Sequence, residues 1–334
     1  MNNYDNIWKE MVKDYDFFDK YENVKNASEE SFDIILPLKN STPLFKENLL
    51  SWYRNININR ILVGDANSGD DSIDIVKDFP RVKIFDHKNF LTSGYSIKKL
   101  IEEVNTDYFF HFHCDVFVNK KTIEPMILNK DKADWLEGSR IHTILFADYA
   151  KNYDEAERSF SGVQFGKSEK LKKATENLED GYCQRSEDIV ITEMVKNHGF
   201  TFLKNTDSVH YHQSMNKKSF SEPEIIDVKI TKKTDPIYEV RAFKWQALGI
   251  IKYCKPKKYL IEEVAQSLFR LRIFDVKFLK ESKDCAEQFN NEWIGKITEK
   301  PKLGFRIIFL LDYLLQNRKK LNLKLILKIF KLLF

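Results

Sequence analysis

Three clusters of polar residues each follow a short apolar run of the chain. Lys39 and Asn40 follow the first run, the acid- and serine-rich residues 65–71 follow the second, and residues 113–115 (His-Cys-Asp) follow a run of sequence YFFHF. Burying a carboxylate at the end of an apolar run is costly unless it has a partner, so Asp115 requires a cation or strong hydrogen-bond donors. These residues are therefore candidates for a binding site.

Further acids and histidines follow downstream. Glu187 and Asp188 stand at the start of an expected helix. His210 and His212 flank one residue of an expected strand and so point to one face, which suits a metal or phosphate site. His111 and His113 have the same spacing, so a site of four histidines is a further option.

Each of these features also has a purely structural explanation. Residues 65–71 are typical of a turn, and Asp115 can cap a helix. Acids in the first turn of a helix complement its dipole, and a single histidine is usually a packed side chain. The coincidence of three polar clusters at strand ends nevertheless favours a site.

The segments around the clusters alternate between strand and helix patterns. This alternation predicts βαβ units in a mostly parallel, Rossmann-like sheet with helices on both faces. Ligands of such sheets bind beyond the carboxyl ends of the strands, where the clusters fall. The expected strands are Phe32–Leu38, 60–63, 82–85 and Tyr108–Phe112, and the expected helices are 42–54, 72–79 and 93–104.

The pattern is less regular after Lys120. We divide the chain into an N-terminal helical extension (1–30), an α/β domain (31–217) and a helical C-terminal region (218–334). Gly199 is expected to end the second helix of this part. The further expected elements are strands at 133–137, 201–203 and 208–211 and helices at 167–177, 187–197, 239–253, 260–269 and 305–315.

Composition limits the class of protein and its location. The net charge of +4 comes from residues 301–334, which hold eight Lys or Arg and one acid, so there is no basic face for nucleic acid. The four cysteines are scattered along the chain and suggest no disulfide framework. The sequence also shows no signal peptide and no apolar run long enough to span a bilayer, so we expect a cytoplasmic protein. Residues 321–334 form a basic amphipathic helix that either lies on an anionic membrane surface or docks on the protein.

The order and spacing of these motifs resemble family-2 glycosyltransferases with the GT-A fold. Pro37, Lys39 and Asn40 match the turn that ends the family's first strand, and residues 65–72 match its acidic loop in length, with Ala66 and Asn67 replacing an Asp and a Gly. His113-Cys114-Asp115 matches the family's Asp-x-Asp metal motif, and Glu187-Asp188 matches its catalytic acid pair. His210 or His212 matches its later metal-binding histidine.

The resemblance implies a role for each matching residue. Asp65 would read the nucleobase, and Asp115 would be the direct metal ligand, while His113 replaces the first acid of the metal motif. The implied nucleotide-sugar site comprises Pro37, Lys39, Asn40, Asp65, Asn67, Ser68, His113 and Asp115, and the implied metal ligands are Asp115, His210 and His212.

The implied function is an inverting transfer of a sugar from a UDP- or GDP-sugar to a glycan or lipid-linked saccharide. Mn²⁺ or Mg²⁺ would stabilise the departing diphosphate, and Asp188, or else Glu187, would take the acceptor's proton. Further contacts to acceptor or phosphate are assigned to Arg140, Arg185 and the loop 161–167.

Two other classes of protein are weighed against this function. A sugar-phosphate nucleotidyltransferase needs a glycine-rich basic loop after the first strand, and residues 38–43 contain no glycine. A non-catalytic scaffold of a membrane-associated glycan assembly complex is favoured by His113 but opposed by the acids at 65, 115 and 188. Dehydrogenases and P-loop enzymes are not favoured, because neither glycine motif is present.

Overall fold

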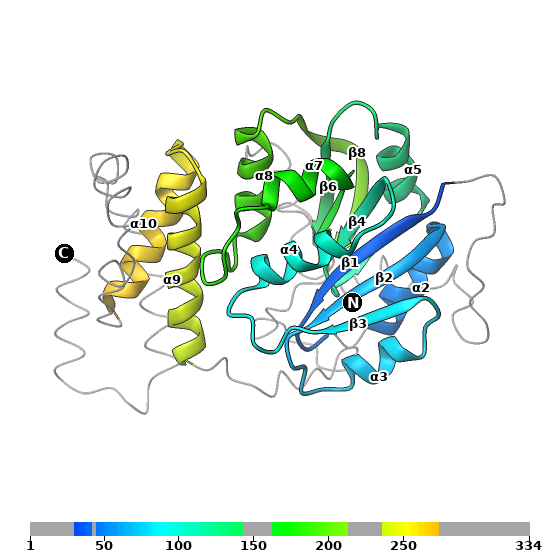
Figure 1. Cartoon of the computed structure of the whole chain (residues 1–334), viewed down its shortest axis with the longest axis horizontal. Coiled ribbons are helices and arrows are strands. Elements are labelled where there is room, and N and C mark those ends of the chain that lie inside the picture. The colour runs from blue at the N-terminus through cyan, green and yellow to red at the C-terminus, as the bar shows by residue number, and fades with distance from the viewer. Residues whose placement is uncertain (1–29, 42–44, 143–161, 213–235, 274–334) are drawn as a thin grey trace, which may run out of the picture. The chain divides into compact units, whose positions relative to one another are not determined.

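The computed structural model describes residues 30–41, 45–142, 162–212 and 236–273 (Figure 1). It divides into two compact units, one of Met1–Asp180 with Ile191–Thr231 and one of Gly181–Val190 with Lys232–Phe334. The expected N-terminal helix, the helix at 305–315 and the basic tail lie outside the described residues. The three-part division made from sequence stays a prediction.

The first unit is built on one mixed sheet of eight strands. Its parallel part contains β3, β2, β1 and β4 as neighbours, and β7 then pairs antiparallel with both β4 and β6. Strand β8 runs parallel to β6 and antiparallel to β5. In sheet order the strands are β3 (Val82–Asp86), β2 (Ile58–Asp65), β1 (Phe32–Leu38), β4 (Tyr108–Phe112), β7 (Val163–Lys167), β6 (Trp135–His142), β8 (Phe202–His212) and β5 (Val116–Phe117).

The alternation of apolar side chains along β1 and β4 gives the sheet two buried faces. Ile34 and Phe110 pack in the larger core with α2 (Phe45–Asn55), α3 (Ser72–Lys77) and α5 (Lys120–Leu128). Ile35 and Phe109 pack in the other core with α4 (Ser93–Glu103), α7 (Ser168–Thr175) and the second half of α8 (Glu187–Asn197). The predicted α/β fold with helices on both faces is therefore confirmed.

The elements after Lys120 differ most from the sequence predictions. Residues 163–167, expected as part of a loop, form β7. The Trp135 ring packs directly on Gly166 of this strand, because a Cβ at that position would lie 2.4 Å from the Cε3 atom of Trp135. The two short strands expected at 201–203 and 208–211 are one strand, β8. Helix α5 was not predicted, and a capping box between Asn119 and Thr122 begins it.

Asp33 is a buried carboxylate at the start of β1. The guanidinium of Arg60 donates to both of its oxygens, Nη2–Oδ2 at 2.6 Å and Nε–Oδ1 at 3.2 Å, and this bonding raises the pKa of Arg60. Asn59 and the backbone N–H of Asn105 also donate to Asp33. The start of β1 is thereby tied to β2 and to the segment before β4.

Replacing Arg60 with methionine is expected to lower the free energy of unfolding by about 2–4 kcal/mol, because the buried Asp33 loses its counter-charge. Urea unfolding measures this change. The control is Lys83→Met, which breaks an exposed ion pair with Glu103 and should cost at most about 0.5 kcal/mol. Equal effects of the two substitutions would contradict the prediction.

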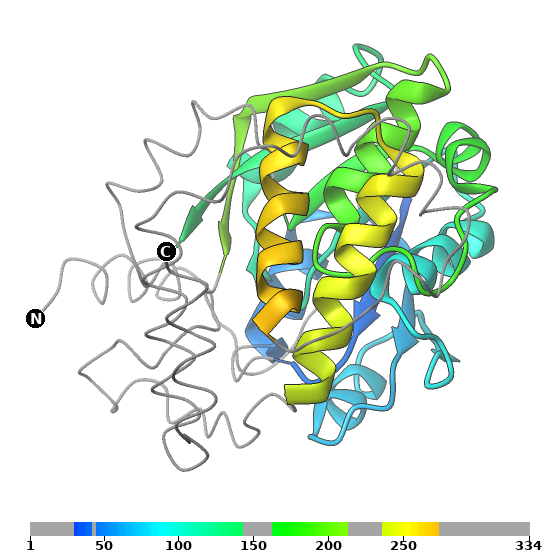
Figure 2. The same cartoon turned by 90° about the vertical axis from the view of Figure 1, so that its left-hand side faces the viewer.

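The described part of the second unit contains α9 (Pro236–Tyr253), α10 (Lys258–Ile273) and the segment Gly181–Val190. Helices α9 and α10 pack side by side (Figure 2). These helices confirm the helical character expected of this region. Among the residues that the structure describes, no helix combines the length and apolar character needed to cross a bilayer.

Candidate active site

The structure brings the first two polar clusters together at one edge of the sheet. Strands β1 and β2 are parallel, and Leu38 at the end of β1 pairs with Asp65 at the end of β2. The loops that follow the two strands therefore begin side by side at the same edge of the sheet. The Asn40 N–H donates to Ser68 Oγ at 3.0 Å, and the Gly69 N–H donates to Asn40 Oδ1 at 2.8 Å. The two loops form one hydrogen-bonded surface.

Local backbone geometry fixes the shape of this surface. Asn40 and Asn67 have φ angles of 56° and 63°, a left-handed conformation that asparagine tolerates better than most residues. The Asp65 carboxylate accepts from the Ser68 N–H at 2.9 Å and so closes its own loop. Asp65 therefore both orders the loop and lies beside the surface that a ligand can reach.

The third cluster leaves the same edge, since β4 runs parallel to β1. Residues 113–115 form a turn between β4 and β5 and are partly exposed. The Asn48 side chain of α2 donates to the Cys114 carbonyl at 2.8 Å, and Trp52 Nε1 donates to the Val116 carbonyl at 3.0 Å. Helix α2 thus holds the turn that carries His113 and Asp115.

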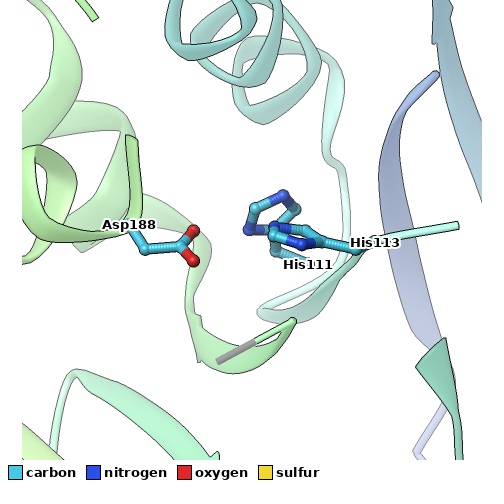
Figure 3. A group of neighbouring side chains, drawn as sticks. All are labelled: His111, His113 and Asp188. Atoms are coloured by element: carbon cyan, nitrogen blue, oxygen red, sulfur yellow. The ribbon is translucent and has the colours of Figure 1, made fainter. Parts of the chain in front are cut away.

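A histidine pair lies at the end of β4. The rings of His111 and His113 have centroids 5.3 Å apart. Their ligand nitrogens lie within 4.8 Å of one another (Figure 3). Imidazole nitrogens are ligands that divalent transition metals accept, so the donor chemistry of this pair fits such a cation.

The comparisons with known proteins identify the domain that carries these loops. Residues 33–145 match the model of the family described as glycosyl transferase family 2. The match spans about a third of the chain. It supports a glycosyltransferase activity for the protein.

Two of the solved structures that match the chain contain nucleotide sugars. One is TarS of S. aureus (residues 1–349, in complex with UDP-GlcNAc), 15% identical, covering 78% of this chain and 80% of that one, with a TM-score of 0.49. Another is the mannosyltransferase PcManGT of Pyrobaculum calidifontis, in complex with GDP-Man and Mn²⁺, 9% identical, covering 98% and 93% of the chains, with a TM-score of 0.49. No curated protein sequence matches the chain significantly.

The acids expected to serve catalysis in this glycosyltransferase lie at the start of α8. Asp188 is 8% exposed, and α8 continues from it to Ile191 and Val195, which are buried in the core of the first unit. Within the second unit, Gln246 of α9 donates to the Ser186 hydroxyl at 2.7 Å, and the Arg185 guanidinium lies 4.7 Å from the centroid of the Phe243 ring.

Glycine makes the contact between this segment and α9 possible. A Cβ on Gly249 would lie 1.6 Å from the Tyr182 carbonyl oxygen, so the backbone of the segment rests directly on α9. Tyr182 also packs edge-on against Tyr253, with ring centroids 6.2 Å apart. The residues just before Glu187 and Asp188 are therefore held by the C-terminal helices.

The predicted residues Arg140, His210 and His212 lie on strands β6 and β8. His210 is buried in β8, two residues after Ser208, whose hydroxyl donates to the Thr122 carbonyl of α5, so alternation places His210 on the α5 side of the sheet. Arg140 pairs with His210 in the register of β6 and β8, and His212 pairs with His142. Within the described residues, the group around His111 includes neither Asp115 nor His210.

Two further residues of this edge were not singled out from sequence. His87 follows β3, hydrogen-bonds Ser96 at 2.7 Å and packs over Gly64, where a Cβ would lie 2.4 Å from its Nδ1 atom. Burial lowers the pKa of His87. Its position directly after a strand was a usable signal, whereas Gln164, which contacts His111, fell in a segment expected to be a loop.

Proposed function

We propose that this glycosyltransferase moves a sugar from a nucleoside diphosphate sugar to a hydroxyl group of a glycan or lipid-linked saccharide. The observation that carries the proposal is the pair of interlocked loops after β1 and β2, with Asp65 at their base, inside the family 2 domain. UDP-GlcNAc and GDP-Man, which the two similar structures contain, exemplify the class of donor.

The reaction is proposed as a single displacement with inversion at the anomeric carbon. The acceptor oxygen forms a bond to that carbon while the bond from the carbon to the diphosphate oxygen breaks, and both electrons leave with the nucleoside diphosphate. The proton of the acceptor passes to the Asp188 carboxylate, or else to Glu187. In this proposal Asp65 and Asn67 bind the nucleoside, while Pro37, Lys39, Asn40 and Ser68 shape the donor pocket.

The donor pocket is also proposed to include His113 and Asp115 and to use Mn²⁺ or Mg²⁺. A divalent cation would supply charge stabilisation for the departing diphosphate. Asp115, with His210 or His212, remains the ligand set proposed from the family motif. Arg140, Arg185 and the loop predicted at 161–167 remain proposed contacts to acceptor or phosphate. Attachment to a membrane surface from the cytoplasmic side stays a proposal about the tail.

A thermal-shift panel of nucleoside diphosphates, each with and without Mn²⁺ or Mg²⁺, tests the donor site. Either UDP or GDP is expected to raise the melting temperature, since a ligand that binds only the native state stabilises it by mass action. Asp65→Ala should abolish the shift. The matched control is Asp74→Ala on α3, an exposed acid paired with Lys77, which should leave the shift unchanged.

The absence of any shift at millimolar nucleotide would refute a functional donor site. The chain would then be better described as a non-catalytic scaffold that keeps the glycosyltransferase fold. A shift that persists in Asp65→Ala would mean that the donor site is functional but that Asp65 is not part of it.

A further inference from the structure

His111 and His113 present two imidazoles on one side of β4 at its carboxyl end. His111 pairs with Ile35 in the parallel register, so it belongs to the sheet face covered by α4, α7 and α8. His111 is 1% exposed, whereas His113 is partly exposed. One imidazole is thus fixed by packing, and the other lies where solvent or a ligand can reach it.

Gln164 sets the tautomer of the buried ring. Its side-chain oxygen lies 2.6 Å from His111 Nδ1, and in this orientation of the amide the oxygen accepts and Nδ1 carries the proton. In the neutral ring the lone pair is then on Nε2. Histidines that bind metals commonly donate their other ring N–H to an oxygen acceptor in this way, which orients the ring and makes it a better ligand.

The distance between the two rings suits a shared cation after a small adjustment. Their ligand nitrogens lie within 4.8 Å of each other, whereas two nitrogens bound to one cation, each at about 2.1 Å, are about 3–3.5 Å apart. Rotation of the partly exposed His113 ring can close this gap. Gln164 and the surrounding core hold the His111 ring in place, so the adjustment falls to His113 alone.

We propose that His111 and His113 bind a divalent transition-metal cation through their ring nitrogens, with Gln164 as the positioning residue of His111. The inference rests on the proposed function, because the cation would serve the diphosphate of the donor. It differs from the ligand set of the family motif, in which Asp115 is the direct ligand. Imidazole ligands favour Mn²⁺, Co²⁺ or Zn²⁺ over Mg²⁺, so the pair also determines which metal the enzyme uses.

Pulsed electron paramagnetic resonance of Mn²⁺ bound to the full chain, without a histidine tag, tests the proposal. Directly bound imidazole nitrogens give ¹⁴N couplings that oxygen ligands do not. We expect two such nitrogens in the wild-type protein, with and without UDP or GDP. His111→Asn and His113→Asn should each remove one nitrogen and weaken Mn²⁺ binding at least tenfold, and Mg²⁺ should compete poorly.

Gln164→Leu separates the positioning residue from the ligands. This variant should keep both nitrogens but bind Mn²⁺ about 10- to 100-fold more weakly, as expected when the partner of a metal-bound histidine is lost. His198→Asn is the control, because His198 is an exposed histidine at the end of α8. That variant should bind Mn²⁺ as the wild type does.

The outcomes distinguish this inference from the proposed function. Nucleotide binding with a cation that shows only oxygen ligands would overturn the histidine pair and leave the transferase proposal intact. Nitrogen-bound Mn²⁺ without any nucleotide binding would support the histidine pair and overturn the transferase proposal. If His111→Asn does not fold, the partly exposed His113→Asn decides, and unchanged nitrogen couplings in that variant overturn the inference.

Discussion

Replacing Asp188 with asparagine is expected to lower kcat/KM for sugar transfer by about 10²–10⁴-fold. Asparagine keeps the size of the side chain but cannot accept the acceptor's proton, and general base catalysis typically contributes a factor of this size. Binding of the nucleoside diphosphate should change little, because the loops after β1 and β2 do not involve Asp188. Steady-state kinetics and a nucleotide titration measure the two effects separately.

Glu187→Gln is the control, since Glu187 is the neighbouring acid in the first turn of the same helix. It should lower kcat/KM less than tenfold if Asp188 is the base. A larger loss in Glu187→Gln than in Asp188→Asn would exchange the two roles. Loss of the ¹⁴N-coupled Mn²⁺ signal in Asp188→Asn would show that this substitution also disturbs metal binding.

Replacing Gly249 with alanine is expected to destabilise the second unit by about 1–3 kcal/mol and to reduce transfer activity. The new Cβ would lie 1.6 Å from the Tyr182 carbonyl, so the backbone of Gly181–Val190 must move away from α9. Alanine favours a helix over glycine by about 1 kcal/mol, which makes a net loss of stability diagnostic of the clash. Urea unfolding and the transfer assay measure the two effects.

Gly199→Ala provides the comparison at a glycine without a steric neighbour. Gly199 has a φ of 76°, and no described atom lies within 4 Å of the position that a Cβ would take, so only backbone strain opposes alanine there. It should cost about 1 kcal/mol and leave transfer activity unchanged. Greater stability of Gly249→Ala than of wild type would show that the segment does not rest on α9 as described.

The two predictions concern the same acid. Asp188 lies in the first turn of α8, and the residues just before it are held by Gln246 and Gly249 within the second unit. A change at Gly249 should therefore lower the transfer rate while nucleotide binding by the loops after β1 and β2 persists. A loss of nucleotide binding in this variant would indicate general unfolding instead.

Local sequence pattern was enough to predict the parallel half of the sheet. The runs at Phe32–Leu38 and Tyr108–Phe112 are predominantly apolar, and amphipathic helices separate the strands, so local pattern sufficed. Because parallel strands end at one edge, the same pattern also placed Asn40, Asp65 and the residues after Phe112 together. The family resemblance followed from these motifs.

The antiparallel half of the sheet and the contacts of the histidines depend on long-range pairing that no local pattern predicts. β7 has no alternation to predict it, since both its faces are buried, and its pairing with β4 depends on residues more than 50 positions away. That pairing brings Gln164 to His111, and no local signal encodes it. Likewise, the sequence around Gly249 shows only a glycine within a helix, and the contact with Tyr182 is visible only in the structure. Packing between segments that are distant in sequence depends on the whole chain rather than on neighbouring residues.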